Sequence, residues 1–282
     1  MRHFFIYTNK CKDRELKETY KIKAYLERHG KICSVAEYNP DTVLSEVSGA
    51  SYTCDIPEGV DCCIVLGGDG TMLQAARNVM GREIPLLGVN LGTLGYLAEV
   101  EKNGIDDALN QLIAGKYDIV DRMMLYGESS TGEHGFALND IVLARCSSLQ
   151  VMNFNIFVNG MYLNNYRADG IILCTPTGST AYNMSAGGPI VEPSAKMILL
   201  TPICPHTFNS RTIVLSADDT ITVELGEGKA GSILQAEASL DGTQSISLKT
   251  GDKINIKRAD QVTRICRLKS VSFLEVLHNK LV

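Results

Sequence analysis

The sequence contains no run of 18 apolar residues, no Cys-x-x-Cys spacing and no His-x-x-x-His pair. The first absence argues against a transmembrane helix, and the segment after Met1 turns polar too early for a signal peptide. The histidine spacing argues against a zinc site. The nine cysteines, some of them inside apolar runs such as Cys62-Cys63-Ile64, are typical of buried reduced thiols. We therefore expect a soluble cytoplasmic protein that does not bind membranes.

A block of basic residues is also missing. The 282 residues carry a net charge of −5 with an isoelectric point near 5.6, and charges of both signs are mixed along the chain. This charge distribution argues against nucleic acid as the main partner. The length suffices for one large or two modest domains with a sizeable core.

Two common phosphate-binding motifs are absent as well. The first predicted strand is followed by Thr8-Asn9-Lys10-Cys11-Lys12-Asp13, without the glycines of a dinucleotide fingerprint. No Gly-Lys-Ser/Thr follows any glycine loop, so a Walker lysine is missing too. A dehydrogenase-type cofactor site is therefore disfavoured.

A different glycine turn is present. In Ile64-Val65-Leu66-Gly67-Gly68-Asp69-Gly70-Thr71-Met72 an apolar strand breaks into glycines around one carboxylate and then resumes as a helix. Glycines allow backbone N–H groups to approach an anion, and Thr71 can cap the helix. Asp69 has the wrong charge for gripping phosphate, so it more plausibly accepts a proton or helps to hold a metal. An ordinary reverse turn is the alternative.

The periodicity predicts two domains. Strands and helices alternate up to residue 115, which favours an open, mostly parallel α/β sheet whose ligands bind at the carboxyl ends of its strands. Turn signals then separate short strands, as in an all-β, sandwich-like domain. We expect an α/β phosphate-binding domain over 1–115, completed by a C-terminal helix in 270–282, and a β-rich domain over 116–269. The predicted elements of the first domain are strands 4–7, 32–35, 62–66 and 85–89 and helices 15–29, 72–80 and 105–114, with 38–60 as a mobile surface segment.

Three further clusters could carry chemistry. Asn90-Leu91-Gly92-Thr93-Leu94-Gly95-Tyr96 follows the next predicted strand, and so should lie beside the first glycine loop unless it is a plain connection. Asn139-Asp140 interrupts an apolar strand and could hold a vicinal diol such as ribose, or form a solvent-facing bulge. Thr175-Pro176-Thr177-Gly178-Ser179-Thr180-Ala181-Tyr182 offers hydroxyls and a ring for a nucleotide, although a turn-rich loop can contain such residues by chance.

The chain resembles NAD kinases in a set of segments that occur in the same order as in that family. They are GGDGT, NLGTLGYLAEV, LND, RADG, TPTGSTAYNMSAGGPI and PHTFNSR. The resemblance covers roughly residues 60–245. It implies an α/β domain plus a β-rich NAD-binding domain, and phosphoryl transfer from ATP, with magnesium or another divalent cation, to the 2′-hydroxyl of the adenosine ribose of NAD.

The resemblance also implies site residues. Asp69 matches the proton acceptor of the family, with Gly67, Gly68 and Thr71 in the phosphate loop. Two positions depart from the pattern: Gln150 stands where some relatives have His, and Thr243 where many have Gln. The residues matching NAD-binding positions are Asp69, Gly70, Asn139, Asp140, Arg167, Asp169, Thr177, Thr180, Ala181, Tyr182, Asn183, Met184 and Ser185.

Alternatives remain open from the sequence: a lipid kinase that shares GGDGT, a dinucleotide sensor without catalysis and an oligomeric scaffold. ATP and polyphosphate are both possible donors, and NADH a possible acceptor. A homo-oligomer, dimer or tetramer, is expected. Arg167 and Asp169 precede the strand 171–174, which spans about 13 Å at ~3.3 Å per residue, and the Thr177–Ser185 loop follows it. One half of the ligand would struggle to touch both ends of this strand within one subunit, and a neighbouring subunit could supply the second contact.

Overall fold

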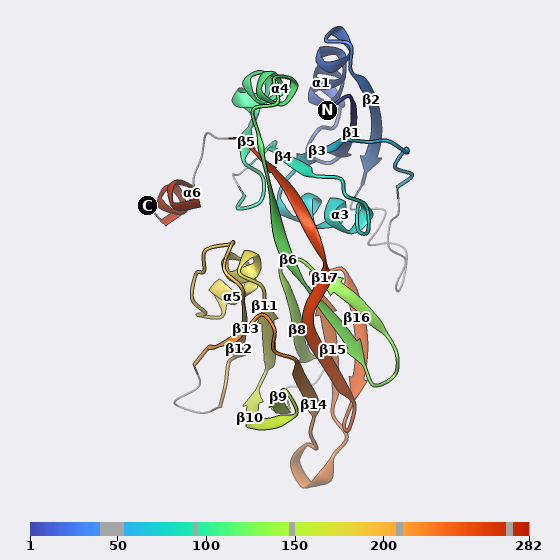
Figure 1. Cartoon of the computed structure of the whole chain (residues 1–282). Coiled ribbons are helices and arrows are strands. Elements are labelled where there is room, and N and C mark those ends of the chain that lie inside the picture. The colour runs from blue at the N-terminus through green and yellow to red at the C-terminus, as the bar shows by residue number, and fades with distance from the viewer. Residues whose placement is uncertain (40–53, 93–94, 147–149, 207–210, 269–272, 282) are drawn as a thin grey trace. The chain divides into compact units, whose positions relative to one another are not determined.

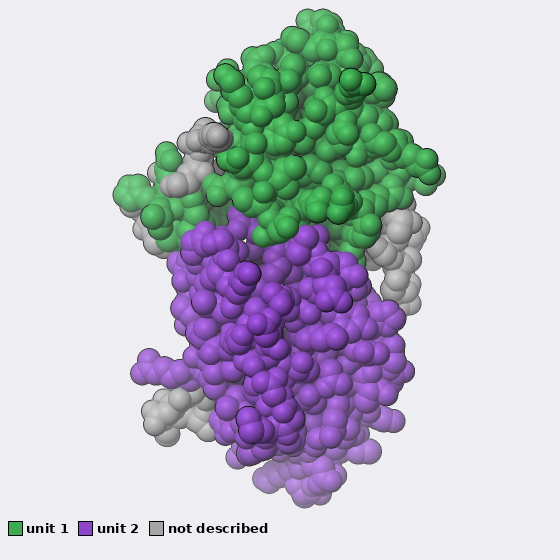
Figure 2. Space-filling view, in the orientation of Figure 1, with its two compact units in different colours: residues 1–121, 263–282 green, residues 122–262 purple. Residues whose placement is uncertain are grey.

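The computed structural model describes residues 1–39, 54–92, 95–146, 150–206, 211–268 and 273–281. The chain divides into two compact units, one formed by Met1–Asp121 with Thr263–Val282 and the other by Arg122–Val262 (Figures 1 and 2). The domain boundaries predicted from the sequence lie at 115/116 and 269/270. The difference arises because strands β6 (Asp118–Ser129) and β17 (Lys253–Arg267) each run from one unit into the other.

The first unit is built on a parallel sheet in the order β2-β1-β3-β4 (Figure 1). Strand β3 is an apolar run whose residues are all buried, as expected for a strand covered on both faces. Short strand β5 and the end of β17 also pair with β4. The predicted open α/β sheet is therefore confirmed. The strands are β1 His3–Asn9, β2 Ile32–Tyr38, β3 Cys62–Gly67, β4 Leu86–Asn90 and β5 Val100–Glu101.

Four described helices belong to this unit: α1 (Lys17–Arg28), α3 (Asp69–Asn78), α4 (Ile105–Ile113) and α6 (Phe273–Leu281), with the 3₁₀ turn η1 (Lys102–Gly104) before α4. Gly30 and Gly115 follow α1 and α4 with φ of 70° and 71°, the left-handed conformation that glycine adopts at helix ends. None of the described helices is long and apolar enough to cross a membrane. Of the segment predicted as mobile, 40–53 lies outside the described residues, while Ile56 and Val60 are buried.

The start of α3 corrects the sequence interpretation. The helix begins at Asp69, not at Met72, and its N-cap is Gly68, which makes no side-chain cap bond. Thr71 is therefore not the cap; its buried hydroxyl instead accepts a hydrogen bond from Asn9 Nδ2 at 3.1 Å. Gly68 is extended, with φ −117°. It turns the chain out of β3 without help from a threonine side chain.

The second unit has two antiparallel sheets, as predicted for an all-β domain. One has the order β13-β12-β11-β8-β15-β16, and the other places β10, β9, β14 and β17 side by side and pairs β6 with β17 and β7. Two short helical segments, η2 (Thr177–Thr180) and α5 (Tyr182–Ser185), follow β11, and η3 (Lys229–Gly231) follows β14. The strands are β7 His134–Ala137, β8 Asp140–Arg145, β9 Met152–Val158, β10 Met161–Ala168, β11 Gly170–Cys174, β12 Met197–Ile203, β13 Ile213–Ser216, β14 Ile221–Leu225, β15 Gln235–Leu240 and β16 Gln244–Lys249.

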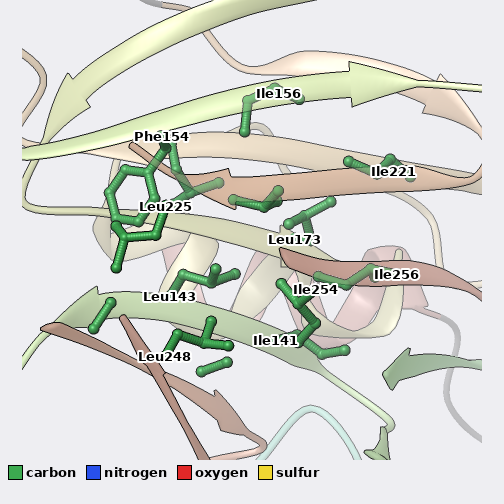
Figure 3. Close-up of a cluster of buried hydrophobic side chains, with 14 of the residues drawn as sticks. Ile141, Leu143, Phe154, Ile156, Leu173, Ile221, Leu225, Leu248, Ile254 and Ile256 are labelled. Carbon is green, nitrogen blue, oxygen red and sulfur yellow. The ribbon is translucent and has the colours of Figure 1, made fainter. Parts of the chain in front are cut away.

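The core of this unit lies between the two sheets. Ile141 and Leu173 from one sheet and Phe154, Ile221 and Ile254 from the other are completely buried in one cluster (Figure 3). Alternate residues of each strand point inward, so the sheets pack face to face as in a sandwich. This packing fixes the ends of β8 and β11, where several predicted site residues lie.

Candidate functional site

Asp69 is held by the second glycine loop. Its carboxylate accepts hydrogen bonds from the backbone N–H groups of Tyr96 at 2.8 Å and Leu97 at 3.1 Å. Asp69 lies just beyond β3 and Tyr96 follows β4, which pairs with β3. The two glycine loops therefore lie side by side at the carboxyl edge of the sheet, as predicted; Thr93 and Leu94 of the second loop lie outside the described residues.

At two glycines of this region, Gly95 and Gly67, any larger residue would clash with a neighbouring side chain. A Cβ on Gly95 would lie 1.9 Å from Asp69 Oδ1, and one on Gly67 would lie 2.3 Å from Thr71 Oγ1. By contrast, a Cβ added to Gly68 or Gly70 would meet no atom within 4 Å, and Gly70 is exposed. The first pair serves packing, whereas Gly68 and Gly70 leave open backbone beside Asp69 that a phosphate could approach.

Asp140 begins β8 in a nearly dry position, only 6% exposed. Burial, and then the nearby Asp241 carboxylate, raise the pKa of Asp140 to about 7. The preceding Asn139 is half-buried. A carboxyl next to a half-buried amide offers hydrogen-bond acceptors and donors that ligand hydroxyls can use.

The loop after β11 packs directly on this pair. Thr175 N donates to Asn139 O at 2.9 Å, and Thr175 Oγ1 donates to Leu138 O at 2.6 Å. A Cβ on Gly178 would lie 2.1 Å from Asn139 O. The predicted diol-binding pair and the threonine-rich loop therefore form one cluster within the second unit.

The predicted residues of that loop differ in whether their side chains are free to contact a ligand. Thr177 Oγ1 is buried without a hydrogen-bond partner among the described residues, so it can serve a ligand. Tyr182 and Met184 are exposed, and the remaining predicted residues Thr180, Ala181 and Ser185 are on the same turn. Asn183 is completely buried: its amide donates to Ser179 O and Pro189 O and accepts from Thr201 Oγ1. Its side chain holds the loop together.

Arg167 and Asp169 lie elsewhere. In the register of β8 and β11, Gly170 pairs with Ala144 whereas Cys174 pairs with Asp140, so the RADG segment lies at the opposite end of β11 from the Thr177 loop. Asp169 forms an ion pair with Arg145, with N···O 3.5 Å. Exposed Arg167 and Gln150 line a separate pocket of about 640 Å³, whose other lining residues are Val151, Asn153, Glu227, Gly228, Lys229, Ala230, Ser232 and Leu234.

Asp241 was missed by the sequence reasoning, which singled out Thr243 of the same turn. Thr243 closes the β15–β16 turn through its N–H to Leu240 O, whereas Asp241 contacts the backbone of Leu138, Asn139 and Asp140. The only signal available was an Asp-Gly turn, which is common. Among the described residues no three His, Cys, Asp or Glu side chains gather as a metal site.

The fold and the site define a class of protein in which an α/β unit with a carboxylate between two glycine loops is linked to a β-sandwich with a cluster of polar side chains. Residues 11–117 match the ATP-NAD kinase N-terminal domain and residues 138–268 the ATP-NAD kinase C-terminal domain. The chain belongs to the ATP-NAD kinase family.

Individual relatives cover the whole chain. It is 47% identical to the NAD kinase of Agathobacter rectalis over 100% of this chain and 99% of that protein, and 42% identical to the NAD kinase of Lachnoclostridium phytofermentans over 99% of each. Among solved structures, yeast NADH kinase complexed with NADH is 25% identical, with a TM-score of 0.81 and coverage of 99% of this chain and 86% of that one. An Archaeoglobus fulgidus NAD kinase in complex with ATP superposes with a TM-score of 0.76 at 24% identity and shares the fold, covering 100% and 98%.

Proposed function

We propose that this chain transfers the terminal phosphoryl group of ATP to the 2′-hydroxyl of the adenosine ribose of NAD, producing NADP. The observation that carries the proposal is 47% identity to an NAD kinase over the full chain. The α/β unit, predicted over 1–115 with 270–282, binds the phosphates. The β-rich unit, predicted over 116–269, binds NAD through Asn139, Asp140 and the Thr177–Ser185 loop.

Asp69 is the proposed proton acceptor for the 2′-hydroxyl. Its carboxylate is fixed by Tyr96 N and Leu97 N and is half-buried, so it can still reach a ligand. A carboxylate is a weak base for a sugar hydroxyl, so Asp69 takes the proton late, as that oxygen bonds to phosphorus. Phosphoryl transfer depends mainly on positioning and on charge stabilisation, which the open amides of Gly68 and Gly70 can assist.

The proposal includes a divalent cation, Mg²⁺ or an equivalent, that enters with the nucleotide, because magnesium in such reactions is bound largely through substrate phosphates. When bound, the ion neutralises charge on the transferring phosphoryl group. The active form is proposed to be a cytoplasmic homo-oligomer, a dimer or a tetramer. Its support is the separation of Arg167 and Asp169 from the Thr177 loop along β11, since one bound NAD could then contact two subunits.

One assay tests the activity directly. Purified protein is incubated with Mg²⁺ and NAD, with ATP as donor, and NADP is measured by a coupled dehydrogenase. Parallel reactions replace ATP by polyphosphate, NAD by NADH, and NAD by lipid micelles. NADP formation is expected, and no NADP from a folded protein with either donor would refute the proposal; phosphorylated lipid would point to a lipid kinase instead.

Asp69→Asn tests the catalytic carboxylate. The amide keeps the size and still accepts one backbone N–H, but it cannot take a proton, so kcat should fall by about 10²–10⁴-fold. The KM for NAD should change far less. Turnover within a few-fold of the unsubstituted enzyme would show that Asp69 does not accept the proton.

A further inference from the structure

The turn Leu138–Asp140 has every backbone polar group satisfied by just two residues. Thr175 donates hydrogen bonds to the carbonyls of Leu138 and Asn139. Asp241 bonds the remaining groups: its N–H donates to Asp140 O at 3.0 Å, and its carboxylate accepts from the N–H groups of all three turn residues. Because buried backbone groups must find partners, these two residues determine the path of the turn.

The Asp241 carboxylate is used by both of its oxygens. Oδ2 accepts from Leu138 N at 2.8 Å, and Oδ1 accepts from Asn139 N at 2.8 Å and Asp140 N at 3.1 Å. Asp241 is 9% exposed and has a φ of +49°, a conformation that aspartate tolerates better than most residues. Hydrogen bonds to a carboxylate are stronger than neutral ones, so three of them define the turn sharply.

We propose that Asp241 is a positioning residue for NAD: by gathering three consecutive N–H groups it fixes the directions of the Asn139 and Asp140 side chains. The proposal rests on the function proposed above, in which these two side chains help to bind NAD. Asp241 itself needs no contact with NAD. Because the turn is already ordered before NAD binds, less conformational entropy is lost on binding than with a loose turn.

Asp241 also acts on Asp140 electrostatically. Within the described part of the chain, the titratable groups that face Asp140 are Asp241, from the β15–β16 turn, and the thiol of Cys174, which pairs with Asp140 across β8 and β11. The negative charge of Asp241 adds to burial in raising the pKa of Asp140. Removing that charge should move the ionisation of Asp140 to lower pH, which a purely structural role would not do.

Asp241→Asn is the test. Its amide offers one acceptor oxygen, and its NH₂ group must face at least one backbone N–H, so the turn loosens. The KM for NAD should rise at least 10-fold while the KM for ATP stays within two-fold, and the pH midpoint of kcat/KM for NAD should move to lower pH.

Asp219→Asn is the matched control. Asp219 also accepts a backbone N–H in a β-turn, from Ser216, but that turn holds no predicted site residue. The KM for NAD and the pH midpoint should therefore stay unchanged.

A folded Asp241→Asn enzyme whose KM for NAD and pH midpoint match those of the unsubstituted enzyme would overturn the proposal. Should the variant not fold, amide hydrogen exchange in the unsubstituted protein without ligand decides: slow exchange at 138–140 supports the proposal and fast exchange overturns it. Absence of NADP formation by the unsubstituted protein would instead refute the proposed function, and the exchange measurement would still report on the turn.

Discussion

Asp140 is a residue whose proposed role in binding NAD comes at the expense of stability. Its carboxyl is 6% exposed. Burial raises its pKa to about 7, and the nearby Asp241, another acid, adds to that rise. The native state therefore binds the Asp140 proton more tightly than the unfolded chain does. The stabilisation linked to Asp140 is complete below the ordinary pKa of the carboxyl, near 3.8, and is lost as the pH rises through 7.

Asp140→Asn should consequently stabilise the protein at pH 8, because no buried charge has to form. A folded-state pKa about three units above the ordinary value corresponds to roughly 2–4 kcal/mol, and the gain should nearly vanish at pH 4. Thermal or urea unfolding of both proteins at the two pH values measures it. An equal difference at pH 4 and pH 8 would mean that ionisation of Asp140 is not its cause. If Asp140 contacts NAD as proposed, the same variant should bind NAD less tightly, since an amide has one acceptor oxygen where a carboxylate has two.

Residue-level chemistry was only partly predictable. Asp69 and Asn139-Asp140 stand out in the sequence because polar groups directly follow or interrupt apolar runs. Asp241 does not stand out, because its partners lie about 100 residues earlier in the chain and only the strand register brings them together. Asn183 illustrates the converse case, since its sequence context suggests a ligand contact while its amide is engaged inside the loop.

At the scale of elements, strands were predictable because buried parallel strands are nearly continuous apolar runs. The ends of α1 and α4 were marked by Gly30 and Gly115. The start of α3 was not, because the Gly-Gly-Asp-Gly stretch has weak helix propensity. In the structure Asp69 contacts the loop after β4, and the helix begins at Asp69 although the local propensity would place its start later.

Gly95→Ala tests how tightly that loop and α3 fit. The added methyl group would lie 1.9 Å from Asp69 Oδ1, so the carboxylate has to leave the N–H groups of Tyr96 and Leu97. Turnover should drop at least 10-fold, as misplacement of a reacting group by an ångström costs heavily. Gly92→Ala is the matched control in the same loop, because its Cβ would meet only Lys12 Nζ at 3.9 Å. Equal turnover in the two variants would show that Asp69 does not need this fit.

At the scale of the whole molecule, the sequence pattern changes near residue 115 from alternating strands and helices to short strands. This change predicted an α/β unit and an all-β unit, and the structure has both. The exact division was harder to predict, because β6 and β17 cross from one unit to the other without any turn signal. The pairing of chain segments within each sheet also depends on long-range register. Local sequence patterns do not contain that register.

The length of one strand supports the proposed oligomer. Asp169, paired with Arg145, lies at one end of β11 and Thr177 beyond the other, and four to five strand residues span about 13–17 Å. If NAD contacts the Thr177 loop of one subunit and the RADG segment of its neighbour, each site needs residues from two chains. Asp69→Asn and Asp169→Ala proteins are each expected to have little activity alone. They should then regain part of the activity after co-expression, because some mixed sites receive both intact residues. Mass spectrometry of tagged subunits verifies that mixed oligomers form. Mixed oligomers without recovered activity, or a fully active monomer, would show that the sites are not shared.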